Sequence, residues 1–146
     1  MQQLVSKVVT KEEFLLNKSQ YYQLFLDGAV FVYPTDTIYG IGCNALNNEA
    51  VEKIRELKGR PEAPFSVIAP SLRWIEENLE VTSAAHEWLK KLPGPYTLIM
   101  KMKKQCVAPS VTNTQSLGVR MPKHWIQNTA AELGVPIVTT SVNKTG

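Results

Sequence analysis

Apolar runs and amphipathic stretches alternate along the chain. Short continuous apolar runs, typical of buried strands, occupy residues 29–33, 65–69, 117–121 and 136–140, and 96–103 alternates like a strand with one wet face. Helical spacing of apolar residues predicts helices over 11–27, 71–79, 83–92 and 123–133. Another helix, capped by Asn47 or Asn48 and ended by Gly59, carries Val51, Ile54 and Leu57 on one face. The alternation predicts an α/β fold with helices packed on a sheet and leaves the strand order undetermined.

The size of the chain fits one domain. It has 146 residues and shows no internal repeat or flexible linker, so we expect a single domain over residues 1–146. Two cysteines, Cys43 and Cys106, do not make a disulfide framework. No apolar run approaches the ~20 residues of a membrane helix, and the first residues lack a signal-peptide pattern. We therefore expect a cytoplasmic protein with no membrane partner.

Positive charge is concentrated in one part of the sequence. The net charge is +3, yet no acidic residue lies between Glu87 and Glu132, where seven lysines and arginines stand. Such a segment favours anionic partners such as phosphates, carboxylates or nucleic acid. The other interpretation, equally open for the cluster from Lys101 to Lys104, is that these lysines are solvated and only keep the protein soluble.

The sequence lacks the residue patterns that several common kinds of site require. His86 and His124 have no Cys, Asp or Glu at metal-ligand spacing, so no metal site is predicted. The sequence contains neither a nucleophile-elbow motif nor a P-loop. Residues 40–45 match G-x-G-x-x-A, but the predicted helix begins too late for a dinucleotide fingerprint. These glycines more simply allow close backbone packing or a bend in a strand.

Four short segments combine hydroxyls, amides and cations at the ends of predicted elements. Their candidate site residues are Thr35, the pair Lys58 and Arg60, the pair Ser116 and Arg120, and the pair Ser141 and Asn143. In a strand, Ser116, Gly118 and Arg120 share one face, and Ser141 shares a face with Asn143. Turn chemistry and a helix dipole explain each segment separately. Together they describe a site rich in donors and cations.

Such a site suits nucleotidyl transfer. If the substrate supplies its own anion, the protein needs no nucleophile and instead aligns the reactants and neutralises charge on the phosphate oxygens. Lys58, Arg60 and Arg120 fit that role. Mg²⁺ would be held mainly by the nucleotide phosphates, so no protein metal site is predicted.

Five ordered blocks extend this interpretation: PTDTIYGIGCNA, ELKGRPEAPFSVIA, LPGPYTLIM, GVRMP and PIVTTSVNKTG. From about residue 27 to the end, they resemble the successive motifs of the YrdC-like family of threonylcarbamoyl-adenylate synthases. The resemblance implies a twisted mixed sheet with a cationic concave pocket. It also implies that ATP, L-threonine and bicarbonate give threonylcarbamoyl-AMP and pyrophosphate. The product serves the threonylcarbamoyl-transferase machinery, which modifies an adenosine in certain tRNAs.

The same resemblance assigns roles to the candidate residues. It places Thr35 and Arg120 at the threonine part. The residues implied to face ATP or the intermediate, and to carry catalysis, are Lys58, Arg60, Ser141 and Asn143. Ser116 joins the substrate-binding set because it shares the face of Arg120.

The chain departs from the family pattern at two places. Ala63 stands where the family usually has a second basic residue, which weakens one anion contact. Relatives also continue beyond the segment that ends here at Gly146, so we expect either a domain truncated at its C-terminus or a reduced family member, and in both cases a pocket that lacks one wall.

Two other functions remain open on the residues. One is a nucleotide- or RNA-binding module of the same fold without turnover, which the basic segment favours although its aromatics are few. The other is carbamoyl-adenylate formation like that of the related hydrogenase-maturation domain, whose accessory segments are absent from this sequence.

Overall fold

The structure is a computed structural model that describes residues 8–35, 39–59 and 63–141. Six α-helices, one 3₁₀ helix and six strands lie in these ranges. The helices are α1 (Lys11–Leu16), α2 (Lys18–Leu26), α3 (Asn48–Lys58), α4 (Leu72–Asn78), α5 (Ser83–Leu89), η1 (Pro109–Val111) and α6 (Ile126–Leu133). The strands are β1 (Phe31–Tyr33), β2 (Gly40–Gly42), β3 (Ser66–Ile68), β4 (Leu98–Lys101), β5 (Ser116–Arg120) and β6 (Ile137–Ser141).

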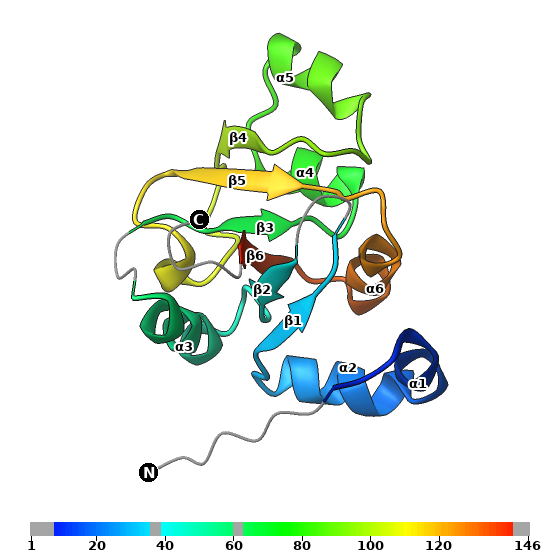
Figure 1. Cartoon of the computed structure of the whole chain (residues 1–146). Helices are drawn as coiled ribbons and strands as arrows, with labels where there is room; N and C mark the ends of the chain where they lie inside the picture. Colours follow the sequence, from blue (N-terminus) through cyan, green and yellow to red (C-terminus); the bar gives the residue numbers. More distant parts are fainter. Residues whose placement is uncertain (1–7, 36–38, 60–62, 142–146) are drawn as a thin grey trace.

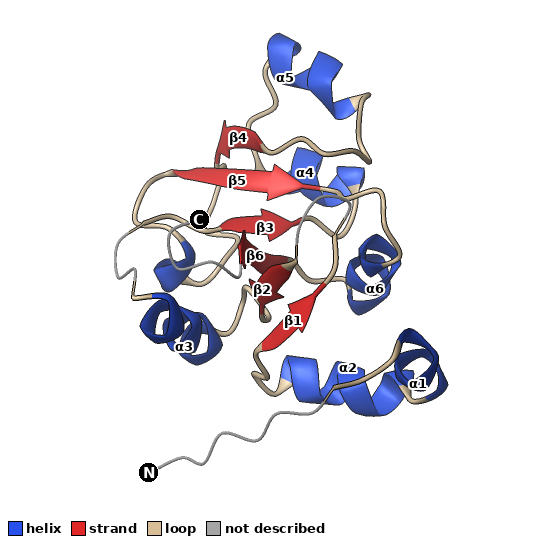
Figure 2. Cartoon of the chain, viewed as in Figure 1, coloured by secondary structure: helices blue, strands red, loops and turns tan. Residues whose placement is uncertain are grey.

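The strands form one mixed sheet in the order β1-β2-β6-β3-β5-β4. Every neighbouring pair is antiparallel except β3 and β5, which are parallel. Figure 1 shows the sheet twisting from β4 to β1, and Figure 2 shows the helices arranged around it. The predicted α/β architecture is confirmed, and the long-range pairing supplies the strand order that the pattern left open.

The two faces of the sheet are covered differently. One face is closed by a large core in which Val67, Val119 and Val138 pack with Val51 and Ile54 of α3. The opposite face is covered only in part, by a smaller cluster with members from β3, β6, α2 and α6. In Figure 1, α1, α2 and α6 lie together beside β1. Within residues 8–35, 39–59 and 63–141, this cluster is the one that packs on the second face, and the candidate site lies on the remainder, here called the open face.

Caps confirm the predicted starts of α3, α4 and α5 and the predicted ends of α3 and α6. The helix predicted over 83–92 ends at Leu89, and the helix predicted over 123–133 begins at Ile126. Asn47 caps α3 by accepting a hydrogen bond from the main-chain nitrogen of Ala50, and Gly59 ends the helix with φ of 64°. Val51 and Ile54 face the core as predicted, whereas Leu57 does not, because its side chain is 48% exposed. The single helix predicted over 11–27 is two helices, separated at Asn17.

The glycines of the G-x-G pattern form β2, a strand that the sequence pattern did not resolve. Gly40 pairs with Tyr33 of β1 and with Ser141 of β6. The aromatic ring of Tyr33 covers this glycine pair: a Cβ built on Gly40 would lie 3.1 Å from the ring, and one on Gly42 would lie 2.6 Å away. The pair therefore allows close packing, as predicted, and lies in a strand between β1 and β6.

Candidate functional site

A polar row on the open face of the sheet follows from strand alternation. Along β5, Leu117 and Val119 are buried in the large core, and Ser116, Gly118 and Arg120 point to the opposite face, as predicted. The parallel register puts Ser66 of β3 beside Gly118, and the antiparallel register puts Thr139 of β6 beside Ser66. Side chains from three strands thus meet on one surface.

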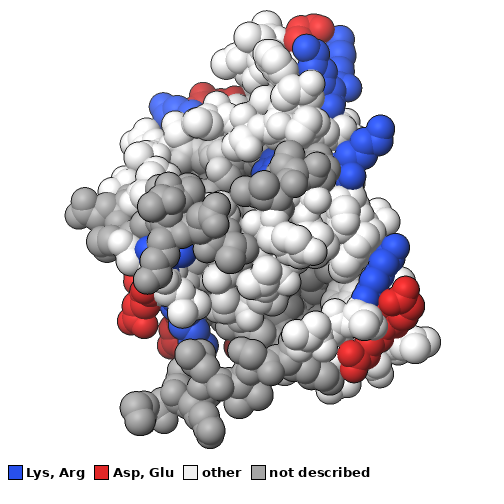
Figure 3. All heavy atoms as spheres, in the orientation of Figure 1, with Lys and Arg blue, Asp and Glu red and all other residues white. Residues whose placement is uncertain are grey.

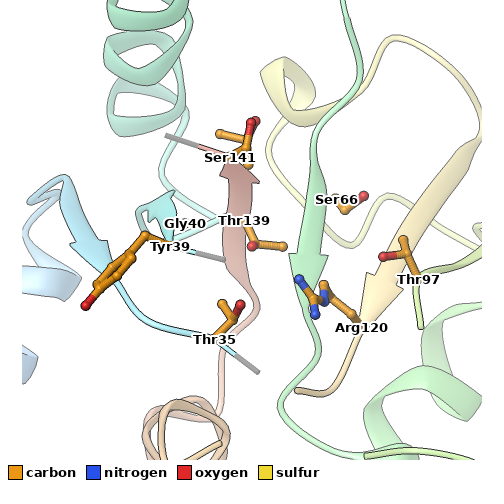
Figure 4. A pocket seen from close by; sticks show the side chains of 9 residues that line it. Thr35, Tyr39, Gly40, Ser66, Thr97, Arg120, Thr139 and Ser141 are labelled. Atoms are coloured by element: carbon orange, nitrogen blue, oxygen red, sulfur yellow. The ribbon is translucent and has the colours of Figure 1, made fainter. Parts of the chain in front are cut away.

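This surface contains a hollow of about 110 Å³. Its lining is formed by Thr35, Tyr39, Gly40, Ser66, Thr97, Arg120, Thr139, Thr140 and Ser141. Figure 4 shows Arg120 reaching across β3 toward Thr139, with Thr35 beside the same space. Tyr39 turns away from Arg120 and is 64% exposed. Among the described lining residues, Arg120 carries the only charge, and hydroxyl groups dominate the rest.

Gly118 lets the floor of the hollow close tightly. A Cβ at this position would lie 2.6 Å from the hydroxyl oxygen of Ser66 and 3.3 Å from the methyl carbon of Thr97. The glycine therefore leaves the Ser66 and Thr97 side chains room to stand side by side. Figure 4 shows both of them next to Arg120.

Lys58 and Ser141 form a contact at the rim. Lys58 ends α3, is only 4% exposed and donates a hydrogen bond from Nζ to the main-chain carbonyl oxygen of Ser141 at 2.5 Å. Ser141 itself lines the hollow. Since Lys58 is not among the described lining residues, its contact with the site runs through the end of β6.

Ser116 lies on the same face but farther along β5. Its main-chain nitrogen donates to the Thr114 hydroxyl at 3.1 Å, and it pairs with Lys101 of β4. It is not one of the described residues that line the hollow. Two other predicted site residues, Arg60 and Asn143, lie outside the described residues.

Sequence reasoning missed several lining residues. Ser66 stands inside an apolar strand, Thr97 lies just before β4, and Thr139 precedes the singled-out Ser141. The available signal was a small polar residue within an otherwise apolar strand. It becomes specific only when the register shows which strands are neighbours.

Of the seven lysines and arginines in the basic segment, Arg120 alone is among the described residues that line the hollow. Lys101 lies 3.9 Å from a carboxylate oxygen of Glu80, and Lys103 donates to the main-chain oxygen of Glu76. On the face shown in Figure 3, lysine and arginine side chains occupy separate places rather than one continuous patch. These contacts favour a structural and solvating role for the Lys101–Lys104 cluster.

Cysteine and metal chemistry have little support here. Burial raises the pKa of the Cys43 thiol to about 12, and burial also raises the pKa of Cys106. Within the described residues, no group of three or more His, Cys, Asp or Glu side chains is placed to hold a metal ion. In the same residues, no helix is long and apolar enough to cross a membrane.

Sequence comparisons relate the chain to known proteins of one family. The family model for Sua5, YciO and YrdC proteins, described as "Telomere recombination", matches residues 23–146. The threonylcarbamoyl-AMP synthase of Vibrio vulnificus (strain YJ016) is 31% identical over 136 residues, which cover 89% of this chain and 73% of that protein. The enzyme of the same name from Bacillus subtilis (strain 168) is 37% identical over 131 residues. This match covers 84% of this chain and 37% of the length of the Bacillus protein.

Solved structures agree on the fold. P. abyssi Sua5 complexed with L-threonine is 30% identical with a TM-score of 0.77, and the match covers 94% of this chain and 41% of that one. E. coli YciO is 28% identical with a TM-score of 0.72, and the match covers 83% of this chain and 61% of the YciO chain. The chain thus spans less than half of the Sua5 structure that it resembles.

Proposed function

The chain belongs to the Sua5/YciO/YrdC family, and from that premise we propose that it is a threonylcarbamoyl-AMP synthase. The proposed reaction joins L-threonine, bicarbonate and ATP and releases pyrophosphate. The product would feed the threonylcarbamoyl modification of tRNA. The observation that carries the proposal is the hollow, in which one guanidinium faces several hydroxyl groups.

The hollow fits a small polar amino acid. Its volume of about 110 Å³ is far below the ~300–1,000 Å³ of pockets that enclose drug-sized ligands. Arg120 offers a planar donor set suited to a carboxylate, and the hydroxyls of Thr35 and Thr139 border the same space. We assign the hollow to L-threonine, with ATP lying outside it along the open face of the sheet.

The chemistry requires no protein nucleophile. The threonine amine and bicarbonate give a carbamate and water. A carbamate oxygen then attacks the α-phosphorus of ATP, the bond from that phosphorus to the bridging oxygen of the β-phosphate breaks, and pyrophosphate leaves. The protein's task is to align these groups and stabilise the developing charge.

The other predicted residues belong to the ATP side in this proposal. Ser141 and Ser116 lie on the open face on either side of Ser66, and Lys58 brings a positive charge to the end of β6. Arg60 and Asn143 are assigned to the same side by resemblance alone. Mg²⁺ would enter bound to the nucleotide phosphates and would neutralise part of their charge.

Product analysis tests the proposal. The chain is incubated with ATP, bicarbonate and L-threonine, and mass spectrometry is used to detect threonylcarbamoyl-AMP. L-Valine serves as the matched control, because a site that binds a hydroxyl group rejects the analogue without it. Product with threonine and none with valine supports the proposal. If ATP binds saturably but no product forms, the alternative of a binding module replaces it.

A further inference from the structure

The ring of Tyr33 connects three neighbouring strands on the face that carries the hollow. Its side chain starts on β1, lies over the glycines of β2 and donates a hydrogen bond from its hydroxyl to the carbonyl oxygen of Val138 on β6, at 3.0 Å. The residue is only 2% exposed. The ring also packs against that of Phe31, with 5.2 Å between the ring centroids.

The acceptor of this hydrogen bond is well placed to influence the site. The carbonyl of Val138 belongs to the peptide unit that leads into Thr139, whose side chain lines the hollow. The main-chain nitrogen of Val138 is held as well, because it donates to the oxygen of Cys43 at 2.9 Å. Tyr33 therefore fixes the orientation of the peptide from which the Thr139 side chain projects.

The hydroxyl of Tyr33 remains a donor at any working pH. Burial raises the pKa of Tyr33 well above its usual range, and a side-chain hydrogen bond with Thr139 and the charge of Arg120 act in the opposite direction to a smaller extent. Both of these residues line the hollow. The phenol thus lies behind the site, within electrostatic reach of two of its functional groups.

We propose that Tyr33 is a positioning residue of the hollow: it holds the Val138–Thr139 peptide and thereby fixes the Thr139 side chain where it lines the hollow. The inference rests on the proposed function for the identity of that amino acid. It gives the G-x-G pattern a reason, since a Cβ would collide with the ring at position 42 and press on it at position 40. Tyr33 itself touches no substrate in this proposal.

The test compares two Tyr→Phe variants. Tyr33→Phe keeps the ring and removes the buried hydroxyl. Tyr22→Phe is the matched control: it removes a hydroxyl that donates to Glu132 at 2.8 Å, on α2 and away from the lining residues. The first measurement, made without substrate, is the side-chain rotamer of Thr139 from three-bond NMR couplings. The second is the KM for L-threonine against that for ATP.

For Tyr33→Phe we expect Thr139 to average between rotamers and the KM for threonine to rise roughly five- to tenfold, the scale of one net hydrogen bond, with the KM for ATP unchanged. In Tyr22→Phe, both quantities should equal those of the wild type. Unchanged Thr139 couplings in Tyr33→Phe would overturn the inference, whatever happens to the melting temperature.

The proposed function and the positioning role of Tyr33 can be disproved independently of each other. If the wild type neither binds nor uses threonine, the proposed function is wrong, and the Thr139 couplings still decide the positioning role. If Tyr33→Phe does not fold, Gly40→Ala replaces it, because the added methyl would lie 3.1 Å from the Tyr33 ring and 3.2 Å from its hydroxyl oxygen, so that the end of the ring has to shift slightly. Averaging of the Thr139 rotamer in a variant whose Tyr33 ring signals have moved would support the inference, and a wild-type Thr139 rotamer with moved ring signals would contradict it.

Discussion

The ammonium nitrogen of Lys58 donates a hydrogen bond to the main-chain carbonyl oxygen of Ser141, joining the last residue of α3 to the last residue of β6. The two residues are 83 positions apart in the sequence. A cation at this point also suits the negative end of the helix dipole. The contact fixes the end of the strand that borders the hollow, so Lys58 supports the site from within the fold.

Lys58→Ala should abolish turnover while the fold is kept, because it removes the positive charge that the proposal places on the ATP side at the end of β6. It also removes a charge-assisted donor from the Ser141 carbonyl, which should lower the free energy of unfolding by roughly 1–3 kcal/mol. Lys53→Ala, an exposed lysine on the same helix, is the matched control and should change neither. Urea denaturation and steady-state rates are the measurements, and wild-type rates in Lys58→Ala would remove Lys58 from the site.

Arg120→Met should weaken L-threonine binding roughly 10- to 100-fold, the range expected when a hydrogen-bonded ion pair is lost. The reason is that Arg120 supplies the only charge among the described residues that line the hollow. Lys123→Met removes an exposed cation three residues later and should leave the affinity unchanged. Isothermal titration calorimetry compares the two. Equal affinity in both variants would mean that the carboxylate of threonine is held elsewhere.

Gly118→Ala should distort the floor of the hollow, because the new methyl would lie 2.6 Å from the Ser66 hydroxyl oxygen. Overpacking of this kind typically costs about 1–3 kcal/mol of stability. Adding Ser66→Ala removes the atom that collides, so the double variant should be more stable than Gly118→Ala alone. Thermal unfolding measures this coupling. Strictly additive effects of the two substitutions would show that the contact is not tight.

Glu132→Gln should reduce stability at neutral pH and have little effect in acid. Hydrogen bonds from Lys18 and Tyr22 lower the pKa of Glu132 below its usual value of 4.5 in the folded state. A carboxyl whose pKa is lowered by folding stabilises the protein above the unfolded pKa, and this contribution is lost as the pH falls through the folded one. The difference in melting temperature between wild type and variant should therefore shrink below about pH 4.5. A difference that does not change with pH would exclude the ion pair as its cause.

Local signals predicted more of the fold than of the site. The Asn47 cap, the Gly59 terminus and the alternation along β5 depend on residues close together in sequence, and each was predictable. The three-residue strand β2 was not, because Gly40 and Gly42 have no side chains to show alternation and their role appears only when Tyr33 lies over them.

The site residues divide in the same way, into those that a local sequence pattern reveals and those that it does not. Arg120 stood out because a cation shared a strand face with Gly118, whereas Ser66 and Thr97 were hidden within apolar surroundings. Their participation depends on the pairing of β3 with β5 and on the approach of Thr97 to Gly118, which join segments about 50 and 20 residues apart. Such contacts depend on the register between strands, which cannot be deduced from the periodicity within one strand.

The most direct test of the central claim is pyrophosphate release from ATP and bicarbonate, with and without L-threonine. The proposed function predicts release that requires L-threonine, saturates with it and falls sharply in Arg120→Met but not in Lys123→Met. Release that is independent of threonine, or saturable ATP binding with no release under any condition, would contradict it.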